Sequence, residues 1–297
     1  MDGKGRTIGV TVAIAVAMAA GCWEVGSAEP ELAVSGHARS ADGVEIAYAD
    51  QGSGSVAIVF IHGGLADRTF WAPQFVLLSG RYRLVAVDLA GHGASGSNRQ
   101  ALTIAAWAVD VCAVVNALKL PRVVLVGNSL GGPVALEAAS LLPWRAIGVV
   151  GVDTLHLATQ SMPKEEAHAR AEAFRKDFAG TCHAMVEALF HPGTQAELRA
   201  WAEKRMCSAS PVVAAAMMEG FGGYDIAQAF RKAGVPVRVI NGDLWPTQTE
   251  VNRTITPDFK AVIMKGAGHY PMLERPAEFS RLLVAYVQAL DQAARSK

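Results

Sequence analysis

Residues 123–132 read VVLVGNSLGG, and this stretch decides the fold class. The unbroken apolar run at 123–126 predicts a buried β-strand, and the apolar spacing from residue 131 onward predicts a helix. The turn between them is Gly-x-Ser-x-Gly, in which Gly127 and Gly131 leave room for strand and helix to approach each other. Such a turn holds its serine in a strained conformation with the hydroxyl raised above the sheet. Ser129 is therefore the candidate nucleophile, and a glycine-bracketed turn without chemistry is the alternative.

Short apolar runs on both sides of this stretch alternate with helical patterns. Nearly continuous runs are typical of parallel strands that are covered on both faces. The runs lie at 56–61, 84–88, 123–126, 147–152, 237–240 and 261–264, and the helical patterns lie at 104–118, 131–142 and 276–293. Residues 44–50 alternate apolar and polar side chains and predict an antiparallel edge strand. The predicted fold is α/β, with a doubly wound, mostly parallel sheet.

Residues 155–233 break this alternation. They read as helix after helix, at 163–178, 181–190, 194–206 and 211–221, with no strand pattern among them. Ligands bind beyond the carboxyl ends of parallel strands, so an all-helical insertion there predicts a lid over the site. The chain then divides into an export signal (1–28), two parts of the α/β core (29–154 and 234–297) and the lid (155–233).

A serine nucleophile needs a base, and His269 is the best-placed histidine. Residues 266–276 read GAGHYPMLERP and follow the last predicted strand, which puts His269 at the same sheet edge as Ser129. His156 also follows a strand and could line the pocket, although a structural role is the simpler interpretation. Solvated or packing roles are expected for His37, His168, His183 and His191.

An oxyanion hole is expected where residues 56–61 run into His62-Gly63-Gly64. That loop can present the backbone N–H of Gly64, and the N–H of Leu130 lies at the start of the helix behind Ser129. Each donor of such a pair contributes about 10²–10³ in rate. The alternative interpretation of the loop is a tight turn whose histidine has only a packing role.

These motifs resemble those of the α/β-hydrolases. Residues 88–95, DLAGHGAS, match the family's Asp-x-x-Gly-x-Gly-x-Ser loop, and residues 268–276 match its Gly-His-x-Pro-x-x-Glu-x-Pro loop. Trp71 follows His62 at a spacing found in many relatives. The resemblance covers about residues 44–293 and implies a Ser-His-acid hydrolase that needs no metal, nucleotide or flavin.

The triad acid departs from the family pattern. Relatives usually carry it where this chain has Trp245, which cannot orient or stabilise an imidazole by charge. Two replacements are available. Asp153 ends the strand at 147–152, and some relatives place their acid there. Asp243 lies two residues before the usual position and would serve if its loop were shifted. We favour Asp153.

The predicted reaction is acyl transfer from a small to medium carboxylic ester or lactone. Ser129 attacks the carbonyl, His269 relays the proton, and the acyl-enzyme is released by water. Flexible thioethers and aromatic rings in the lid favour an apolar pocket, with Met217 and Phe221 beside Trp71 as candidate substrate contacts.

Other functions remain open at this stage. A perhydrolase or cofactor-free haloperoxidase would use the same triad, and so would an acyl-homoserine lactonase. A binding protein with a degraded triad is the alternative from another class, supported by Trp245. Equal numbers of basic and acidic residues, 27 each, give no net charge and speak against a nucleic-acid partner.

The N-terminus predicts export. Lys4 and Arg6 precede a short uncharged run at 7–20, as in a secretory signal peptide. Residues 19–22, AAGC, resemble a lipobox, so that Cys22 would be lipidated and attach the chain to a membrane; ordinary cleavage before Glu29 is the alternative. The expected location is periplasmic, secreted or outer-membrane, in a bacterium.

In an oxidising compartment the remaining cysteines matter. Cys182 and Cys207 both lie in the predicted lid and could form a disulfide, which their spacing alone does not establish. Cys112 lies in an apolar helical stretch and is expected to be a buried small hydrophobic residue.

Overall fold

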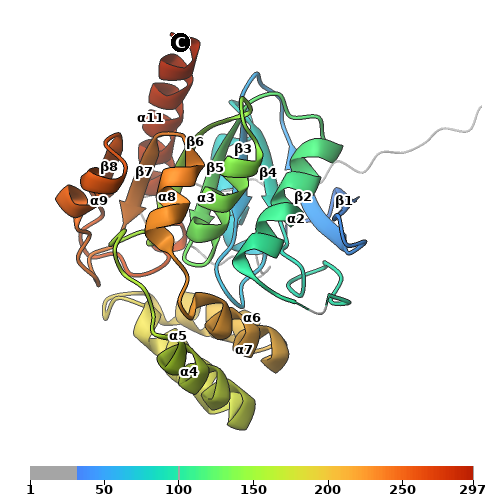
Figure 1. Ribbon diagram of the computed structural model, residues 1–297, viewed down its shortest axis with the longest axis vertical. Helices are drawn as coiled ribbons and strands as arrows, with labels where there is room; N and C mark the ends of the chain where they lie inside the picture. The colour runs from blue at the N-terminus through green and yellow to red at the C-terminus, as the bar shows by residue number, and fades with distance from the viewer. Residues whose placement is uncertain (1–31, 100, 297) are drawn as a thin grey trace, which may run out of the picture.

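An eight-stranded sheet forms the centre of the protein, with strand order β1-β2-β4-β3-β5-β6-β7-β8 (Figure 1). The computed structural model describes residues 32–99 and 101–296; the predicted signal at 1–28, with Cys22, lies outside them. The pairs β1–β2 and β2–β4 are antiparallel, and all other neighbours are parallel. The strands are β1 (Gly36–Arg39), β2 (Glu45–Gln51), β3 (Ala57–Ile61), β4 (Arg83–Val87), β5 (Val123–Asn128), β6 (Ala146–Val152), β7 (Val237–Asn241) and β8 (Phe259–Ile263).

Helices cover both faces of the sheet, which explains why the central strands are apolar throughout. Every residue of β3, β5, β6 and β7 is buried. On one face α2 (Ile104–Ala117), α3 (Gly131–Leu141) and α8 (Ile226–Ala233) lie side by side (Figure 1). On the other, α1 (Ala72–Leu78) packs against α11 (Pro276–Arg295). The predicted doubly wound α/β fold is confirmed.

The short elements of the fold are the ones missing from the sequence prediction. The strand β1 pairs with β2 at the sheet edge, and the 3₁₀ helix η1 (Arg68–Trp71) leads into α1. Two further short helices, α9 (Thr249–Ile255) and α10 (Pro271–Glu274), flank β8. Each has seven residues or fewer, which is too few to show a clear apolar period.

Four helices between β6 and β7 form a separate cluster beyond the ends of the strands, called the helical insertion below (Figure 1). They are α4 (Lys164–Lys176), α5 (Phe178–Leu189), α6 (Ala196–Met206) and α7 (Pro211–Phe221). The prediction assigned residues up to 233 to this cluster, but α8 lies against α3 and is part of the helical layer on the sheet.

The cysteines divide between the insertion and the core. Cys182 in α5 and Cys207 at the end of α6 form a disulfide, which closes the insertion on itself. Cys112 is a free, buried thiol in α2, and burial raises its pKa to about 11. Among the described residues, no helix combines the length and the apolar character needed to span a bilayer.

Candidate active site

Ser129 lies in the turn between β5 and α3, with a left-handed backbone at φ 51°. The glycines on either side are required by space. A Cβ at Gly127 would lie 2.0 Å from the carbonyl oxygen of Gly131, and a Cβ at Gly131 would lie 2.4 Å from that of Ile61. The Ser129 N–H donates to the Val152 carbonyl at 3.2 Å, so the turn is held against the end of β6. This backbone is that of the predicted nucleophile turn.

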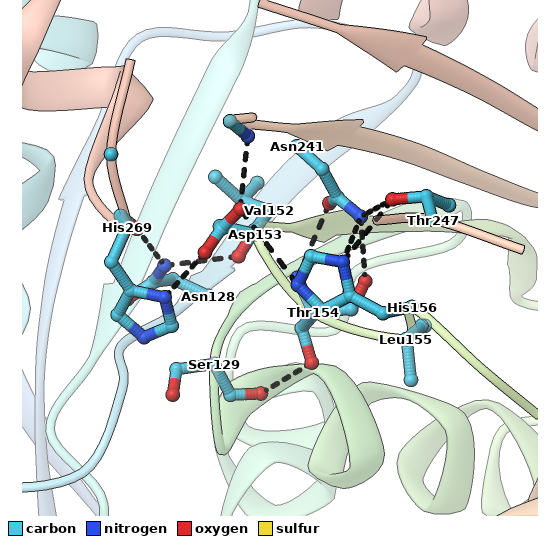
Figure 2. A network of polar contacts seen from close by, with 12 residues as sticks. Asn128, Ser129, Val152, Asp153, Thr154, Leu155, His156, Asn241, Thr247 and His269 are labelled. Carbon is cyan, nitrogen blue, oxygen red and sulfur yellow. Dashed lines mark hydrogen bonds and ion pairs between the residues drawn. The ribbon is translucent and has the colours of Figure 1, made fainter. Parts of the chain in front are cut away.

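His269 and Asp153 meet beside Ser129, although 116 positions separate them in the sequence. The His269 Nδ1–H donates to Asp153 Oδ2 at 2.5 Å. Figure 2 shows the other ring nitrogen, Nε2, on the side of the Ser129 hydroxyl. Asp153 is fully buried, and its other oxygen, Oδ1, accepts the backbone N–H of Gly242 at 2.9 Å. An imidazole held in this tautomer presents Nε2 as a proton acceptor.

The backbone of Asp153 also departs from ordinary strand geometry, with φ at 43°. Its N–H donates to the Ile240 carbonyl at 3.1 Å, as a last step of the parallel pairing between β6 and β7. Directly beyond that bond the chain turns. The carboxylate of Asp153 therefore sits between the ends of β6 and β7 and reaches the loop that follows β8.

The loop that carries His269 is tied down by Glu274. Its carboxylate accepts the backbone N–H of Gly268 at 3.0 Å and that of Tyr270 at 3.2 Å, one on each side of the histidine. The hydroxyl of Thr194, from the insertion, donates to the same carboxylate at 2.6 Å. Glu274 thus fixes the backbone from which the imidazole projects, which gives a physical reason for the glutamate in the histidine motif.

Asn128, which the sequence analysis did not single out, links the serine turn to the histidine loop. Its side-chain N–H groups donate to the Val152 carbonyl at 2.9 Å and to the His269 carbonyl at 3.0 Å (Figure 2). A polar residue that directly precedes the candidate nucleophile in an otherwise apolar strand was the available signal. The two loops therefore share a buried amide as well as the proposed proton path.

The His62-Gly63-Gly64 loop passes directly beside the serine turn. A Cβ at Gly63 would lie 3.1 Å from Ser129 Cβ. The Leu89 N–H donates to His62 Nε2 at 3.0 Å, so Nδ1 carries the proton and donates to the Gly63 carbonyl at 2.7 Å. Burial lowers the pKa of His62, which keeps the ring neutral. His62 is thus a packing and positioning residue for this loop.

The two predicted oxyanion donors belong to the two loops just described, Leu130 to the serine turn and Gly64 to the His62-Gly63-Gly64 loop. Leu130 precedes α3, where backbone N–H groups have no acceptor within the helix. Gly64 lies under Met217 of α7, and a Cβ at Gly64 would lie 1.8 Å from the Met217 sulfur. Met217 is buried, and Phe221, one helical turn further along α7, is partly buried. The insertion therefore reaches down onto the loop of the predicted oxyanion hole.

Of the two candidate acids, the structure brings Asp153 to His269. Asp243 is exposed, and its carboxylate accepts the backbone N–H of Gly266 at 3.0 Å. Trp245, at the position where relatives usually carry the acid, packs edge-on against the His269 ring with centroids 5.6 Å apart. The acid that holds His269 therefore comes from the end of β6, and Trp245 packs on the same imidazole.

Trp71, a predicted substrate contact, lies elsewhere. It is fully buried and packs against Phe60, with ring centroids 4.8 Å apart, and against Phe279 of α11. A side chain with no exposed surface, enclosed by core aromatic rings, is not available to a substrate. The spacing from His62 that suggested a site residue belongs to the core beneath the site.

Comparison with known proteins identifies the family of this chain. The sequence pattern of the alpha/beta hydrolase family matches residues 58–282. A pimeloyl-acyl-carrier-protein methyl ester esterase of Xanthomonas campestris is 27% identical over 248 residues, which are 79% of this chain and 96% of that protein. The chain belongs to the alpha/beta hydrolase family.

Two solved structures extend the comparison. A thermophilic esterase from Thermogutta terrifontis has 26% identity and a TM-score of 0.75, covering 86% of this chain and 98% of its own. An enzyme described as degrading N-acyl homoserine lactones has 26% identity and a TM-score of 0.70, covering 84% and 99%. The chain is thus similar to hydrolases that act on esters and on lactones.

Proposed function

We propose that this protein is a serine hydrolase that cleaves a small to medium carboxylic ester or lactone through an acyl-enzyme. One observation carries the proposal: the imidazole of His269 is held by a buried carboxylate, with its second nitrogen facing the side of a serine in a left-handed turn (Figure 2). A non-catalytic binding protein would have no need of this arrangement. The main support for that alternative was Trp245 at the usual position of the acid. The hydrogen bond between Asp153 and His269 weakens that support, because Asp153 can serve as the acid instead.

In the first step Ser129 Oγ attacks the carbonyl carbon while His269 Nε2 takes its proton. The negative oxygen that forms is stabilised by the backbone N–H groups of Gly64 and Leu130. The imidazolium, stabilised by Asp153, then protonates the leaving alcohol, and the ester bond breaks. In the second step His269 activates a water that attacks the acyl-enzyme, and Ser129 recovers its proton.

The helical insertion acts in this proposal as a lid. The Met217 thioether covers Gly64, and the His269 N–H donates to the Leu189 carbonyl of the insertion at 2.8 Å. A substrate carbonyl has to enter between these contacts, so movement of α7 is part of substrate binding. The thioether and aromatic side chains there suit an apolar acyl or alcohol group.

The esterase and lactonase relatives support both substrate classes. An acyl-homoserine lactone and an open ester would present the same carbonyl to Ser129. The difference is whether the leaving oxygen stays tethered to the acyl group. Perhydrolysis would need peroxide in place of water as the second nucleophile, and we rank it below hydrolysis.

Export remains part of the proposal. The signal at residues 1–28 lies outside the described residues, and the Cys182–Cys207 disulfide is of the kind that persists in oxidising compartments.

The test compares the chain from Glu29 onward with its Ser129→Ala variant. Hydrolysis of p-nitrophenyl acetate and butyrate and ring-opening of an N-acyl homoserine lactone are measured on both. We expect turnover by the parent protein and a fall of at least about 10³-fold in the variant. Equal background rates from both proteins on all three substrates would contradict a serine hydrolase.

A further inference from the structure

A second histidine faces the carboxylate that holds His269. His156, three residues after Asp153 in the loop beyond β6, has its Nε2 3.8 Å from Asp153 Oδ1. The two carboxylate oxygens thus have different partners. Oδ2 accepts from His269, whereas Oδ1 accepts from the Gly242 N–H and faces His156 (Figure 2).

The hydrogen-bond network around His156 fixes its tautomer. The side-chain oxygen of Asn241 accepts the Thr154 N–H at 3.2 Å, so the other terminal atom of Asn241 is the amide nitrogen, a donor. That nitrogen lies 3.2 Å from His156 Nδ1 and 2.9 Å from Thr247 Oγ1. Thr247 Oγ1 in turn lies 3.1 Å from His156 Nδ1.

These partners place Nδ1 best as an acceptor. If the amide of Asn241 donates to Nδ1 directly, Nδ1 is an acceptor. If the amide donates to Thr247 instead, the Thr247 hydroxyl keeps its own proton for Nδ1, whereas an N–H on Nδ1 would lie against the amide NH₂ of Asn241. In both cases the neutral ring carries its proton on Nε2, which is the nitrogen that faces Asp153.

The surroundings of this partly buried ring favour its neutral form. Burial lowers the pKa of His156, and the Asp153 carboxylate beside it acts in the opposite direction. Trp245 packs edge-on against His156, with ring centroids 6.2 Å apart, and against His269. Among the described residues, the ionisable groups that face His156 are Asp153 and His269.

We infer that His156 is a positioning residue of the active site, which directs its Nε2–H at Asp153 Oδ1 and so keeps Oδ2 on His269. This inference rests on the proposed hydrolase activity. At 3.8 Å the contact is longer than a hydrogen bond and acts through the N–H dipole on the charged oxygen. His156 takes no proton from the reaction and touches no reacting atom.

The inference predicts a specific pattern in His156→Phe. The phenyl ring fills the same space but has no N–H donor. The Asp153 carboxylate is then less well oriented, and its negative charge is less well stabilised. We expect kcat to fall about threefold with KM nearly unchanged, since a donor to a charged group is lost. Because more of the charge on Asp153 is then available to the imidazolium of His269, the acid limb of kcat/KM moves to higher pH.

Two further variants separate positioning from packing. His156→Gln keeps one donor and one acceptor, and we expect it to restore most of kcat and the acid limb. His168→Phe makes the same exchange on an exposed histidine of the insertion and serves as the matched control. An unmoved acid limb in His156→Phe, or equal losses in the Phe and Gln variants, would overturn the inference.

A measurement without substrate keeps this test independent of the proposed function. The ¹⁵N chemical shifts of the imidazole nitrogens report which one carries the proton. We expect His156 as the Nε2–H tautomer at neutral pH, and the Nδ1–H tautomer would overturn the inference whatever the enzyme does. If Ser129→Ala leaves hydrolysis intact, the proposed function fails while this measurement still decides the role of His156.

Discussion

The sheet edge and the helical insertion hold the site together in different ways. At the sheet edge Ser129, Asp153 and His269 are positioned by hydrogen bonds to the ends of neighbouring strands. The insertion is held together by a disulfide and packed helices, and it contacts the site through the Met217 side chain, the Leu189 carbonyl and the Thr194 hydroxyl. This difference indicates that the reacting groups and the entry of substrate to them can be changed independently. Changes at the sheet edge should alter the rate of reaction, and changes in the insertion should alter stability and substrate choice.

The largest expected effect is a loss of kcat on substitution of Asp153 at the sheet edge. In Asp153→Asn the side-chain oxygen still accepts the Gly242 N–H, which turns the NH₂ group toward His269 and forces the wrong tautomer on the ring. We expect kcat to fall about 10⁴-fold, as on loss of the acid in other triads. Steady-state kinetics on a p-nitrophenyl ester measures it.

Asp243→Asn is the matched comparison for that prediction. Its oxygen can still accept the Gly266 N–H, so we expect kcat to stay within about twofold of the parent value, as for most surface substitutions. A large loss in Asp243→Asn with little change in Asp153→Asn would reverse the assignment of the acid.

Removal of the disulfide should lower the local stability of the insertion and leave that of the sheet unchanged. The bond spans 25 residues, and a loop of that length contributes about 3 kcal/mol to the free energy of unfolding. In Cys182→Ser/Cys207→Ser we expect faster amide hydrogen exchange in residues 164–221 and unchanged exchange in β5 and β6. The measurement is hydrogen exchange read by mass spectrometry. Equal loss of protection in the sheet would show that insertion and core unfold as one unit.

As pH falls, a histidine of the core and a histidine of the insertion should change the free energy of unfolding in opposite directions. Burial lowers the pKa of His92 in the core to about 3. Below about pH 6.5 the unfolded chain therefore binds the proton first, and stability is lost as pH falls toward 3. In the insertion the His183 Nδ1–H donates to the Glu203 carboxylate, which raises the pKa of His183. That pair therefore stabilises the fold below the ordinary histidine pKa and loses its effect as pH rises.

Urea unfolding at pH 7, 6 and 5 tests this contrast. We expect His92→Phe to flatten the decline in the free energy of unfolding toward acid, and His183→Phe to steepen it slightly. Parallel pH profiles for the parent protein and both variants would contradict the assigned signs.

The smallest expected effect is on substrate choice. Met217→Ala removes the thioether above Gly64 and opens space beside the predicted oxyanion hole. We expect kcat/KM for p-nitrophenyl butyrate to rise about threefold relative to the acetate, as one or two extra methylenes find room. Comparison of the two esters on parent and variant measures it. An unchanged ratio would mean that α7 does not contact the acyl chain.

The sequence was most informative where local geometry and chemistry coincide. Ser129 was predicted because only glycines tolerate the approach of strand and helix around it, and His269 because its loop directly follows the last strand. The central strands were predicted for the same reason, since burial on both faces leaves an unbroken apolar run. Such signals are contained within a few residues.

The rest depends on how distant segments meet. The sequence favoured Asp153 but kept Asp243 as the alternative acid. In the structure the difference between them follows from a left-handed backbone at Asp153 and from the Gly266 N–H, which donates to Asp243. The burial of Trp71 reflects its packing on α11, far along the chain. Whether α8 joined the insertion or the sheet layer depended on its contacts with α3. None of these contacts leaves a local pattern in the sequence.

The position of the acid at the end of β6, with Trp245 beyond β7, has a consequence for how this protein can change. Since Asp153 comes directly after β6, the turn beyond β7 does not have to supply the acid for His269. Its Trp245 is 38% exposed and packs against the outer side of the imidazole. The acid therefore places no constraint on that turn. Here it offers a position for directed evolution next to the reacting centre, where side-chain size and polarity can be varied while the serine, the histidine and their carboxylate stay in place.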